Sequence, residues 1–415
     1  MLTPFEYRGG VLHCEDVEVE RIAAEAGTPV YIYSASAIRA RFKEYDQALE
    51  GVPHRVCYAV KANGNLSVLR LLAGEGAGFD IVSGGELFRV VKAGGDVSRV
   101  VFAGVGKNRD EIEQALEAGI HSFNCESESE IRLIDALAAR MGKRASVAVR
   151  VNPDVDAATH PYISTGLKEH KFGIGIGEVE GVYERARGLT GVRMEGVACH
   201  IGSQLLDLAP LIEAAQRLIE LVERLRGRGF EIKYLDLGGG IGVPYKADDA
   251  RPNVPAFLAA IRDLVKGRGL RLLFEPGRSI VAEAGALVMR LLFRKQGESK
   301  EFMVVDAAMT ELIRPALYGA YHEIVPCRTS RIPGTVRADV VGPVCESADF
   351  LAKDRDLPQV MPGEYMAVMT AGAYGWVASS NYNARPRAAE VMVDGCEWRV
   401  VRKRENYEDL IRGEI

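Results

Sequence analysis

The sequence predicts an α/β barrel of the TIM type, (β/α)8, followed by a mostly antiparallel β domain. Short apolar runs alternate with helical patterns from residue 29 to about residue 285, and beyond that point strands follow one another. There are about eight strand–helix units over roughly 250 residues, which is the size of a closed barrel. Because such repeats need right-handed crossovers, the first sheet should be parallel.

Nine stretches read as strands of the barrel region: Val30–Tyr33, Val56–Val60, Phe79–Val82, Val100–Ala103, Ser122–Asn124, Ser146–Val151, Val192–His200, Lys233–Leu237 and Leu270–Phe274. Helices are expected at Ala35–Leu49, Ser67–Gly74, Gly85–Ala93, Arg109–Ala118, Ser127–Met141, Leu208–Arg226 and Val254–Lys266, with another beginning at Ser279. Ser34 can cap the first of them. The alternative is an open doubly wound sheet. That fold usually carries a nucleotide fingerprint, and GxGxxG fails at Gly238–Val243 while GxxxxGK[ST] does not occur.

The remaining stretches favour an antiparallel β domain. Strands are expected at Val288–Phe293, Phe302–Asp306, Thr335–Val341, Tyr365–Met369, Ala388–Val393 and Trp398–Val401. Turn pairs such as Asp394-Gly395 separate them, and a longer helical pattern occurs only near Ala308–Ala316. The N-terminal strand-like residues precede the barrel rhythm and can join this domain. We therefore expect a barrel over residues 29–285 and a second domain built from residues 1–28 with 286–415.

Composition and motifs argue against several classes of function. A net charge of −5, with no basic cluster carrying interleaved aromatics, gives no reason to expect nucleic acid as a partner. The seven cysteines are far apart and form no CxxC pair, which suits reduced thiols in the cytoplasm. No signal pattern begins the chain, and no apolar run approaches the ~20 residues of a membrane span. HExxH and GxSxG are absent and the histidines do not fall at ligand spacings, so we expect no metal site.

Polar residues follow several of the expected barrel strands, where barrels place their chemistry. The stretch VCYAVKANGN ends a buried strand at Lys61, and turn formers follow it. A partly buried lysine can form a Schiff base with an aldehyde cofactor such as pyridoxal phosphate (PLP). The alternative is a lysine that points into solvent.

Further candidates follow later strands, each with an ordinary structural alternative. Gly238-Gly239-Gly240 exposes backbone N–H groups that suit a phosphate, or it forms a flexible turn. Ser203 and the backbone near Gly277 can add donors. Glu275 can face a pyridine nitrogen and keep it protonated, or it is an exposed loop acid. His200 can lie flat on a cofactor ring, or it is a core residue.

The second domain holds three more candidate stretches. Arg314 and Tyr318 stand a helical turn apart, Cys345 adjoins Glu346 after a strand, and Tyr374 lies between small residues. The structural alternatives are surface charges and a buried, inert thiol.

Seven motifs together closely resemble the diaminopimelate decarboxylases, which are fold-type III PLP enzymes like alanine racemase and ornithine decarboxylase. They are YAVKAN, HIGSQ, LDLGGGIG, FEPGR, RPALYGAYH, GPVCESAD and GAYG…SNYNARPRAAEV, in this order from residue 56 to about residue 393. The resemblance implies a PLP-binding barrel, a β-sandwich-like second domain completed by N-terminal residues, and a homodimer with active sites at its interface. It also implies decarboxylation of meso-2,6-diaminopimelate to L-lysine and CO2, the last step of lysine biosynthesis.

The resemblance further assigns roles to matching positions. Lys61 matches the Schiff-base lysine, and Cys345 matches a proton donor supplied by the other subunit. The residues matching cofactor contacts are His200 on the ring, Glu275 at the pyridine nitrogen, Ser203, Gly239, Gly240, Gly277 and Arg278 at the phosphate, and Tyr374. The residues matching substrate contacts are Arg278, Arg314, Tyr318, Glu346 and Tyr374.

Two other interpretations stay open. One is a related PLP enzyme: a racemase, or a decarboxylase of another basic amino acid or of a carboxylated polyamine. A racemase would use a tyrosine base, and Cys345-Glu346 argues against it. The other is a non-catalytic homologue. Lys61 argues against it, because such proteins commonly lose the lysine.

The polar segment 160–173 is our candidate for a mobile lid over the site, or it is an ordinary long loop.

Overall fold

The computed structural model describes residues 4–155, 171–298, 300–330 and 332–415. The chain forms two compact units. One, here called the barrel unit, comprises Arg41–Val243 and Ala250–Ser279. The other, the sheet unit, comprises Met1–Ala40, Pro244–Asp249 and Ile280–Ile415. The segment 160–170, most of our candidate lid, lies outside the described residues.

The barrel unit contains a closed parallel barrel. In the described residues eight strands pair in parallel, in the order of the chain, and the last pairs with the first. They are β5 (His54–Ala59), β6 (Gly78–Ile81), β7 (Val100–Phe102), β8 (Ser122–Cys125), β9 (Ala145–Asn152), β11 (Val192–Ala198), β12 (Tyr234–Asp236) and β13 (Arg271–Phe274). The two-residue strand β10 (Ile174–Gly175) adds to β9. The predicted fold class is thus confirmed.

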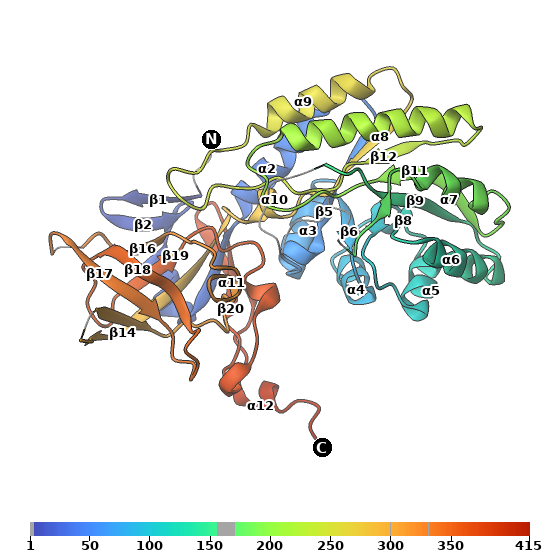
Figure 1. Ribbon diagram of the computed structural model, residues 1–415. Helices are drawn as coiled ribbons and strands as arrows, with labels where there is room; N and C mark the ends of the chain where they lie inside the picture. The colour runs from blue at the N-terminus through green and yellow to red at the C-terminus, as the bar shows by residue number, and fades with distance from the viewer. Residues whose placement is uncertain (1–3, 156–170, 299, 331) are drawn as a thin grey trace. The chain divides into compact units, whose positions relative to one another are not determined.

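Helices follow the strands and lie outside them (Figure 1). They are α2 (Ala35–Ala48), α3 (Leu66–Gly74), α4 (Gly84–Lys92), α5 (Arg109–Ala118), α6 (Glu128–Arg140), α7 (Val179–Ala186), α8 (Ala209–Gly227) and α9 (Val254–Val265), with the short α10 (Arg278–Val281). Asn108 and Ser127 cap α5 and α6 by accepting backbone N–H groups, and Ser34 does so for α2 as expected. Along α8 the buried side chains recur every three or four residues, which turns one apolar face toward the core.

One expected barrel strand belongs elsewhere. β4 (Val30–Ser34) pairs antiparallel with β14 (Gly285–Gln296) and parallel with β20 (Ala389–Asp394), inside the second sheet. Placing Val30–Tyr33 in the barrel is therefore wrong. All five residues of β4 are buried, and a strand covered on both faces has the same continuous apolar pattern in either sheet. Its removal leaves the eight barrel strands.

The sheet unit is built mainly from strands. β1 (Phe5–Arg8), β2 (Val11–Cys14) and β3 (Val17–Glu18) form a small antiparallel sheet that leads into α1 (Val19–Ala26). Within the described residues a second sheet of nine strands combines β4 and β14 with β15 (Glu301–Val305), β16 (Ile324–Pro326), β17 (Thr335–Val341), β18 (Phe350–Pro358), β19 (Tyr365–Val368), β20 and β21 (Glu397–Arg402). Only β15–β17 and β20–β4 pair in parallel among these strands. The N-terminal residues thus complete a sheet made by the C-terminal third of the chain.

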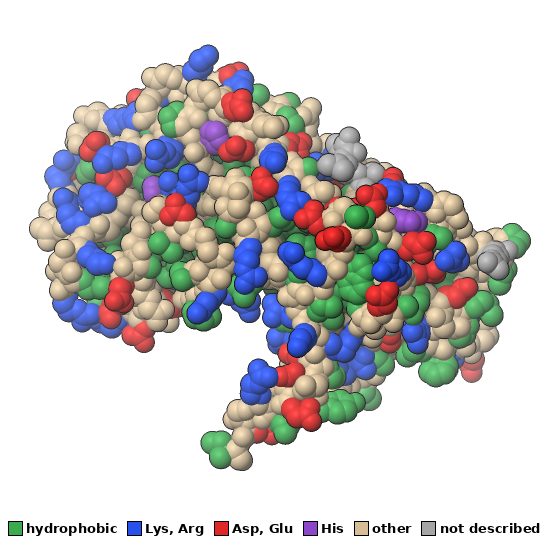
Figure 2. All heavy atoms as spheres, turned by 180° about the vertical axis from the view of Figure 1, so that it is seen from behind, with side chains coloured by type: hydrophobic (Ala, Val, Ile, Leu, Met, Phe, Trp, Pro, Cys, Tyr) green, Lys and Arg blue, Asp and Glu red, His purple; other side chains and the backbone are tan. Residues whose placement is uncertain are grey.

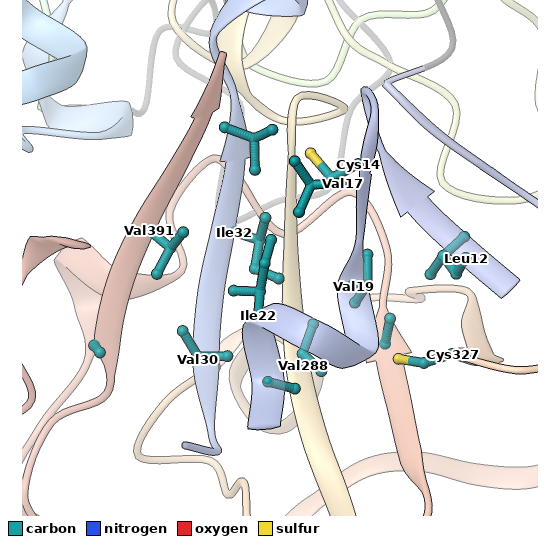
Figure 3. Packing of buried hydrophobic residues seen from close by; sticks show 14 residues of the cluster. Leu12, Cys14, Val17, Val19, Ile22, Val30, Ile32, Val288, Cys327 and Val391 are labelled. Carbon is teal, nitrogen blue, oxygen red and sulfur yellow. The ribbon is translucent and has the colours of Figure 1, made fainter. Parts of the chain in front are cut away.

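The core of the sheet unit joins distant parts of the sequence. Ile22 of α1 and Ile32 of β4 are fully buried with Val288 of β14 and Val391 of β20. Figure 3 shows these side chains gathered between the helix and the sheet.

Two predictions of secondary structure in the sheet unit are wrong. The helix expected near Ala308–Ala316 is only α11 (Arg314–Tyr318), and β18 was not expected.

The surface carries both signs of charge. On the face seen in Figure 2, basic and acidic side chains are interspersed. Among the described residues no helix is long and apolar enough to cross a membrane. The same residues contain no cluster of three or more His, Cys, Asp or Glu side chains that could hold a metal ion.

Candidate active site

Lys61 lies at the carboxyl end of the first barrel strand. β5 ends at Ala59, and a 3-10 helix, η1 (Val60–Ala62), turns the chain there. The Lys61 Nζ lies 2.6 Å from Oδ2 of Asp80, which stands on the neighbouring strand β6 and is fully buried. Asp80 Oδ1 is also buried and accepts no hydrogen bond from any described residue. Asp80 thus holds the lysine at the mouth of the barrel and retains accepting capacity.

Lys61 lines a cavity of about 380 Å³. Its lining includes Lys61, His200 and Glu275, three residues that sequence reasoning selected independently, together with Asn124 and Arg150. The remaining wall comes from the loop after β7 and from neighbouring strand ends. This volume falls in the range of pockets that hold a small organic ligand.

Glu275 belongs to a buried pair of carboxyl groups. Asn124 Nδ2 donates to Asp236 Oδ2 at 2.9 Å and to Glu275 Oε1 at 3.2 Å, so it joins the two. Burial, then the charges of Asp236 and Asp80, raise the pKa of Glu275 well above its usual range. Burial also raises the pKa of Asp236. This environment favours a proton on the pair, or a cationic ligand beside it.

His200 presents a neutral ring to the cavity. Its Nδ1 lies 3.2 Å from the N–H of Gly239 and must accept, since a backbone N–H can only donate. Burial, then the charges of Arg150 and Lys61, push the pKa of His200 well below its usual range. The ring is therefore an uncharged imidazole with its proton on Nε2. Such a ring can pack against a flat ligand.

The glycines after β12 and β13 allow close backbone approach. Gly240 has a φ of +104°, and a Cβ there would lie 2.5 Å from the carbonyl oxygen of Gly202. A Cβ on Gly239 would overlap the carbonyl oxygen of Glu275, and one on Gly277 would lie 2.9 Å from Cβ of Ala62. The Gly239 N–H is engaged by His200, so this glycine contributes space more than a donor.

Ser203 and Arg278 lie close together in the barrel unit. Arg278 Nη2 donates to Ser203 Oγ at 3.0 Å. Ser203, like His200, follows the end of β11, and Arg278 begins α10 directly after Gly277. The contact joins two of the motifs from which we predicted a phosphate site.

The other selected residues lie in the sheet unit. Arg314 is buried at the start of α11, and Tyr318 is partly exposed at its end. Cys345 is exposed, and its N–H donates to Asn383 Oδ1 at 2.8 Å. The neighbouring Glu346 Oε1 accepts from the backbone N–H of the next residue at 3.0 Å. Tyr374 has a φ of +55°, the left-handed conformation that is uncommon outside glycine.

Comparison with known proteins identifies the family. A family model described as pyridoxal-dependent decarboxylase, pyridoxal binding domain, matches residues 35–282. A diaminopimelate decarboxylase of Pseudomonas aeruginosa is 55% identical over 99% of this chain and 98% of its own. The chain belongs to the diaminopimelate decarboxylase family. The resemblance stated above is thereby confirmed, and so are its PLP dependence and its class as a decarboxylase.

Solved structures agree with this family. Diaminopimelate decarboxylase from Helicobacter pylori in complex with L-lysine has a TM-score of 0.90 and 43% identity, over 95% of this chain and 98% of that one. The enzyme from M. jannaschii in complex with L-lysine has a TM-score of 0.94 and 37% identity, over 100% and 99% of the two chains.

The barrel of this family member fits PLP. Lys61 can hold the aldehyde carbon, and Glu275 lies in a setting that favours a cationic ring nitrogen. The neutral His200 offers a flat surface, and Gly240 clears the room that a phosphate needs. These groups border one cavity or the loops next to it.

Sequence reasoning missed two members of this site, Asp236 and Asn124. Both lie inside strands, β12 and β8, whereas the barrel residues selected from the sequence stand at or after the ends of strands. The available signal was an aspartate inside the apolar run YLDL directly before the three glycines.

Proposed function

We propose that this protein removes CO2 from meso-2,6-diaminopimelate to give L-lysine, the last step of lysine biosynthesis, with PLP carried on Lys61. The observation that carries the proposal is the shared cavity of Lys61 and Glu275 in a chain 55% identical to a diaminopimelate decarboxylase. When bound, PLP supplies an aldehyde that bonds an amine and a cationic ring that draws electrons from the carbon losing CO2.

The barrel residues hold and tune that chemistry. Asp80 keeps the Lys61 amine aimed into the cavity at 2.6 Å. Glu275, backed by Asp236 and Asn124, receives the proton-bearing ring nitrogen and keeps it cationic. His200 covers the ring without adding charge. Ser203, Gly240, Gly277 and Arg278 border the phosphate.

The sheet unit supplies groups for the substrate. Arginine pairs with carboxylates through two parallel hydrogen bonds, so Arg314 of this unit suits the distal carboxylate, as does Arg278 of the barrel unit. Glu346 suits the distal ammonium, with Tyr318 and Tyr374 as further contacts. A diamino acid without that carboxylate would leave arginine donors unpaired, which can separate substrates by several orders of magnitude.

Cys345 is the proposed acid. Its Sγ–H gives a proton to the carbon that has lost CO2, which replaces the departed carboxylate with hydrogen. Exposure of the thiol supports its action in the active site of a partner subunit, so we propose a homodimer with shared sites.

The state of the cysteines supports a cytoplasmic location. All seven cysteines lie in the described residues and none forms a disulfide, as is usual in that reducing compartment.

The proposal is tested with purified protein loaded with PLP. We expect a visible absorption band that borohydride bleaches, and CO2 release from meso-2,6-diaminopimelate but not from L-ornithine. Lys61→Ala should abolish both the bleachable band and gas release. Preferential release from ornithine would indicate the related decarboxylase instead, and a colourless, inactive protein would overturn the proposal.

A further inference from the structure

Arg314 is held by a buried histidine eight positions along the chain. His322 is fully buried, and its Nε2 lies 2.7 Å from Arg314 Nη1. A guanidinium has donors only, so Nε2 must accept. On the other side of the ring, Nδ1 lies 2.9 Å from the carbonyl oxygen of Met369, which can only accept. Both contacts require the same form: a neutral imidazole with its proton on Nδ1.

Other contacts fix this histidine and the plane of the arginine. Arg355 Nη2 donates to the carbonyl oxygen of His322 at 2.6 Å. The Tyr245 ring stands edge-on to the His322 ring, with centroids 5.1 Å apart and planes at 79°. The same tyrosine ring lies 4.6 Å from Arg314 Cζ, so it supports the guanidinium. Arg314 is thus held at one nitrogen by His322 and supported by Tyr245.

Such a clamp has a physical use. Two parallel hydrogen bonds to a carboxylate form only when guanidinium and carboxylate lie nearly in one plane. An arginine side chain loses considerable rotamer freedom when it adopts one pose. A clamp that fixes the pose beforehand removes that cost from binding.

We propose that His322 is a positioning residue: it orients the Arg314 guanidinium for the distal carboxylate of the substrate. The inference rests on the proposed function, in which Arg314 binds that carboxylate. His322 itself is assigned no catalytic step. It acts on recognition through Arg314, and Tyr245 assists it.

Two substitutions at His322 separate orientation from simple filling of space. The amide oxygen of His322→Gln reaches the position of Nε2 and can accept from Arg314. The shorter His322→Asn keeps an amide donor for Met369 but has no acceptor near the arginine. We expect His322→Asn to raise KM for meso-2,6-diaminopimelate about tenfold to a hundredfold, the range of one hydrogen bond to a charged group. Its kcat should stay within about threefold, and His322→Gln should be close to wild type in both.

Competitive inhibitors distinguish orientation of Arg314 from a merely structural role of His322, which would not change their relative inhibition constants. L-lysine retains the carboxylate and amine of the distal centre, whereas 1,5-diaminopentane has the same chain without a carboxylate. In His322→Asn the inhibition constant of lysine should rise with KM while that of 1,5-diaminopentane stays constant. The absorption band of bound PLP should be unchanged.

Each outcome decides the inference. An unchanged KM, or an equal loss of both inhibitors, would overturn the role of His322. If His322→Asn does not fold, Tyr245→Leu removes the supporting ring, and a selective weakening of lysine is again the expected result. A wild-type protein that releases no CO2 from diaminopimelate would instead overturn the proposed function, and the inference with it.

Discussion

Three carboxylates face one amine at the carboxyl end of the barrel, where the further cation that lines the cavity, Arg150, is paired with Glu126. Asp80 and Asp236 are fully buried, Glu275 is nearly so, and Lys61 reaches Asp80. Negative charge is therefore in excess around the cavity unless a proton or a cation offsets it. A cationic ring nitrogen is such an offset, so the unloaded site carries an electrostatic cost that the cofactor relieves.

This cost predicts a pH-dependent stability of the protein without PLP. The folded pKa of Glu275 lies above its unfolded value, so the folded state binds more protons than the unfolded state. The free energy of unfolding therefore falls as the pH rises from the unfolded pKa through the folded one. We expect Glu275→Gln to unfold at a higher temperature than wild type at pH 8, and to differ less at pH 5. Thermal unfolding of the two unloaded proteins checks this, and equal differences at both pH values would contradict it.

A second residue-scale prediction concerns the exposed thiol. Cys345→Ala should keep the PLP band but lower kcat about a hundredfold to ten-thousandfold, the usual contribution of a positioned general acid. Cys396→Ala is a matched control, since Cys396 is also an exposed cysteine and lies in the turn between β20 and β21. Steady-state CO2 release compares the two. Similar kinetics for both variants would remove Cys345 as the acid.

At the scale of elements, the loop after β12 depends on its glycines, which have no side chain. Gly240→Ala places a methyl group 2.5 Å from a carbonyl oxygen at a φ of +104°. We expect PLP to bind at least tenfold more weakly, measured by titrating the unloaded protein. Gly267→Ala is the control. Gly267 also has a positive φ, +78°, but open space around it. A Cβ there therefore costs only about 1 kcal/mol of backbone strain, and PLP affinity should not change.

The elements also show how far sequence patterns reach. The barrel strands were predictable because each combines an apolar run with turn formers, and Lys61, His200 and Glu275 were found because barrels place chemistry at strand ends. β4 was misplaced because its pattern does not reveal which sheet buries it. Asp236 was missed inside a strand, and the contact of His322 with Arg314 depends on side-chain positions that no spacing encodes. The placement of the selected residues in two different domains, by contrast, was part of the sequence prediction.

At the scale of the whole molecule, β4 ties the beginning of the chain to its end. Ile32 is fully buried in the cluster that contains Val288 and Val391. We expect Ile32→Ala to lower the free energy of unfolding by about 2–5 kcal/mol, because it leaves a cavity in a packed core. Val400→Ala, at a half-exposed position of β21, should cost much less. Denaturant unfolding measures both, and equal losses would argue against a central place for β4.

The position of β4 also bears on synthesis of the chain. Its two strand partners are β14 and β20, and β20 lies near the carboxyl end. During translation β4 emerges from the ribosome early and β20 emerges late. All barrel strands emerge between the two. The barrel can therefore close before translation finishes, but one edge of β4 must wait unpaired until β20 has been made. Premature termination near residue 380 would leave a finished barrel beside an open edge, and such a product should aggregate.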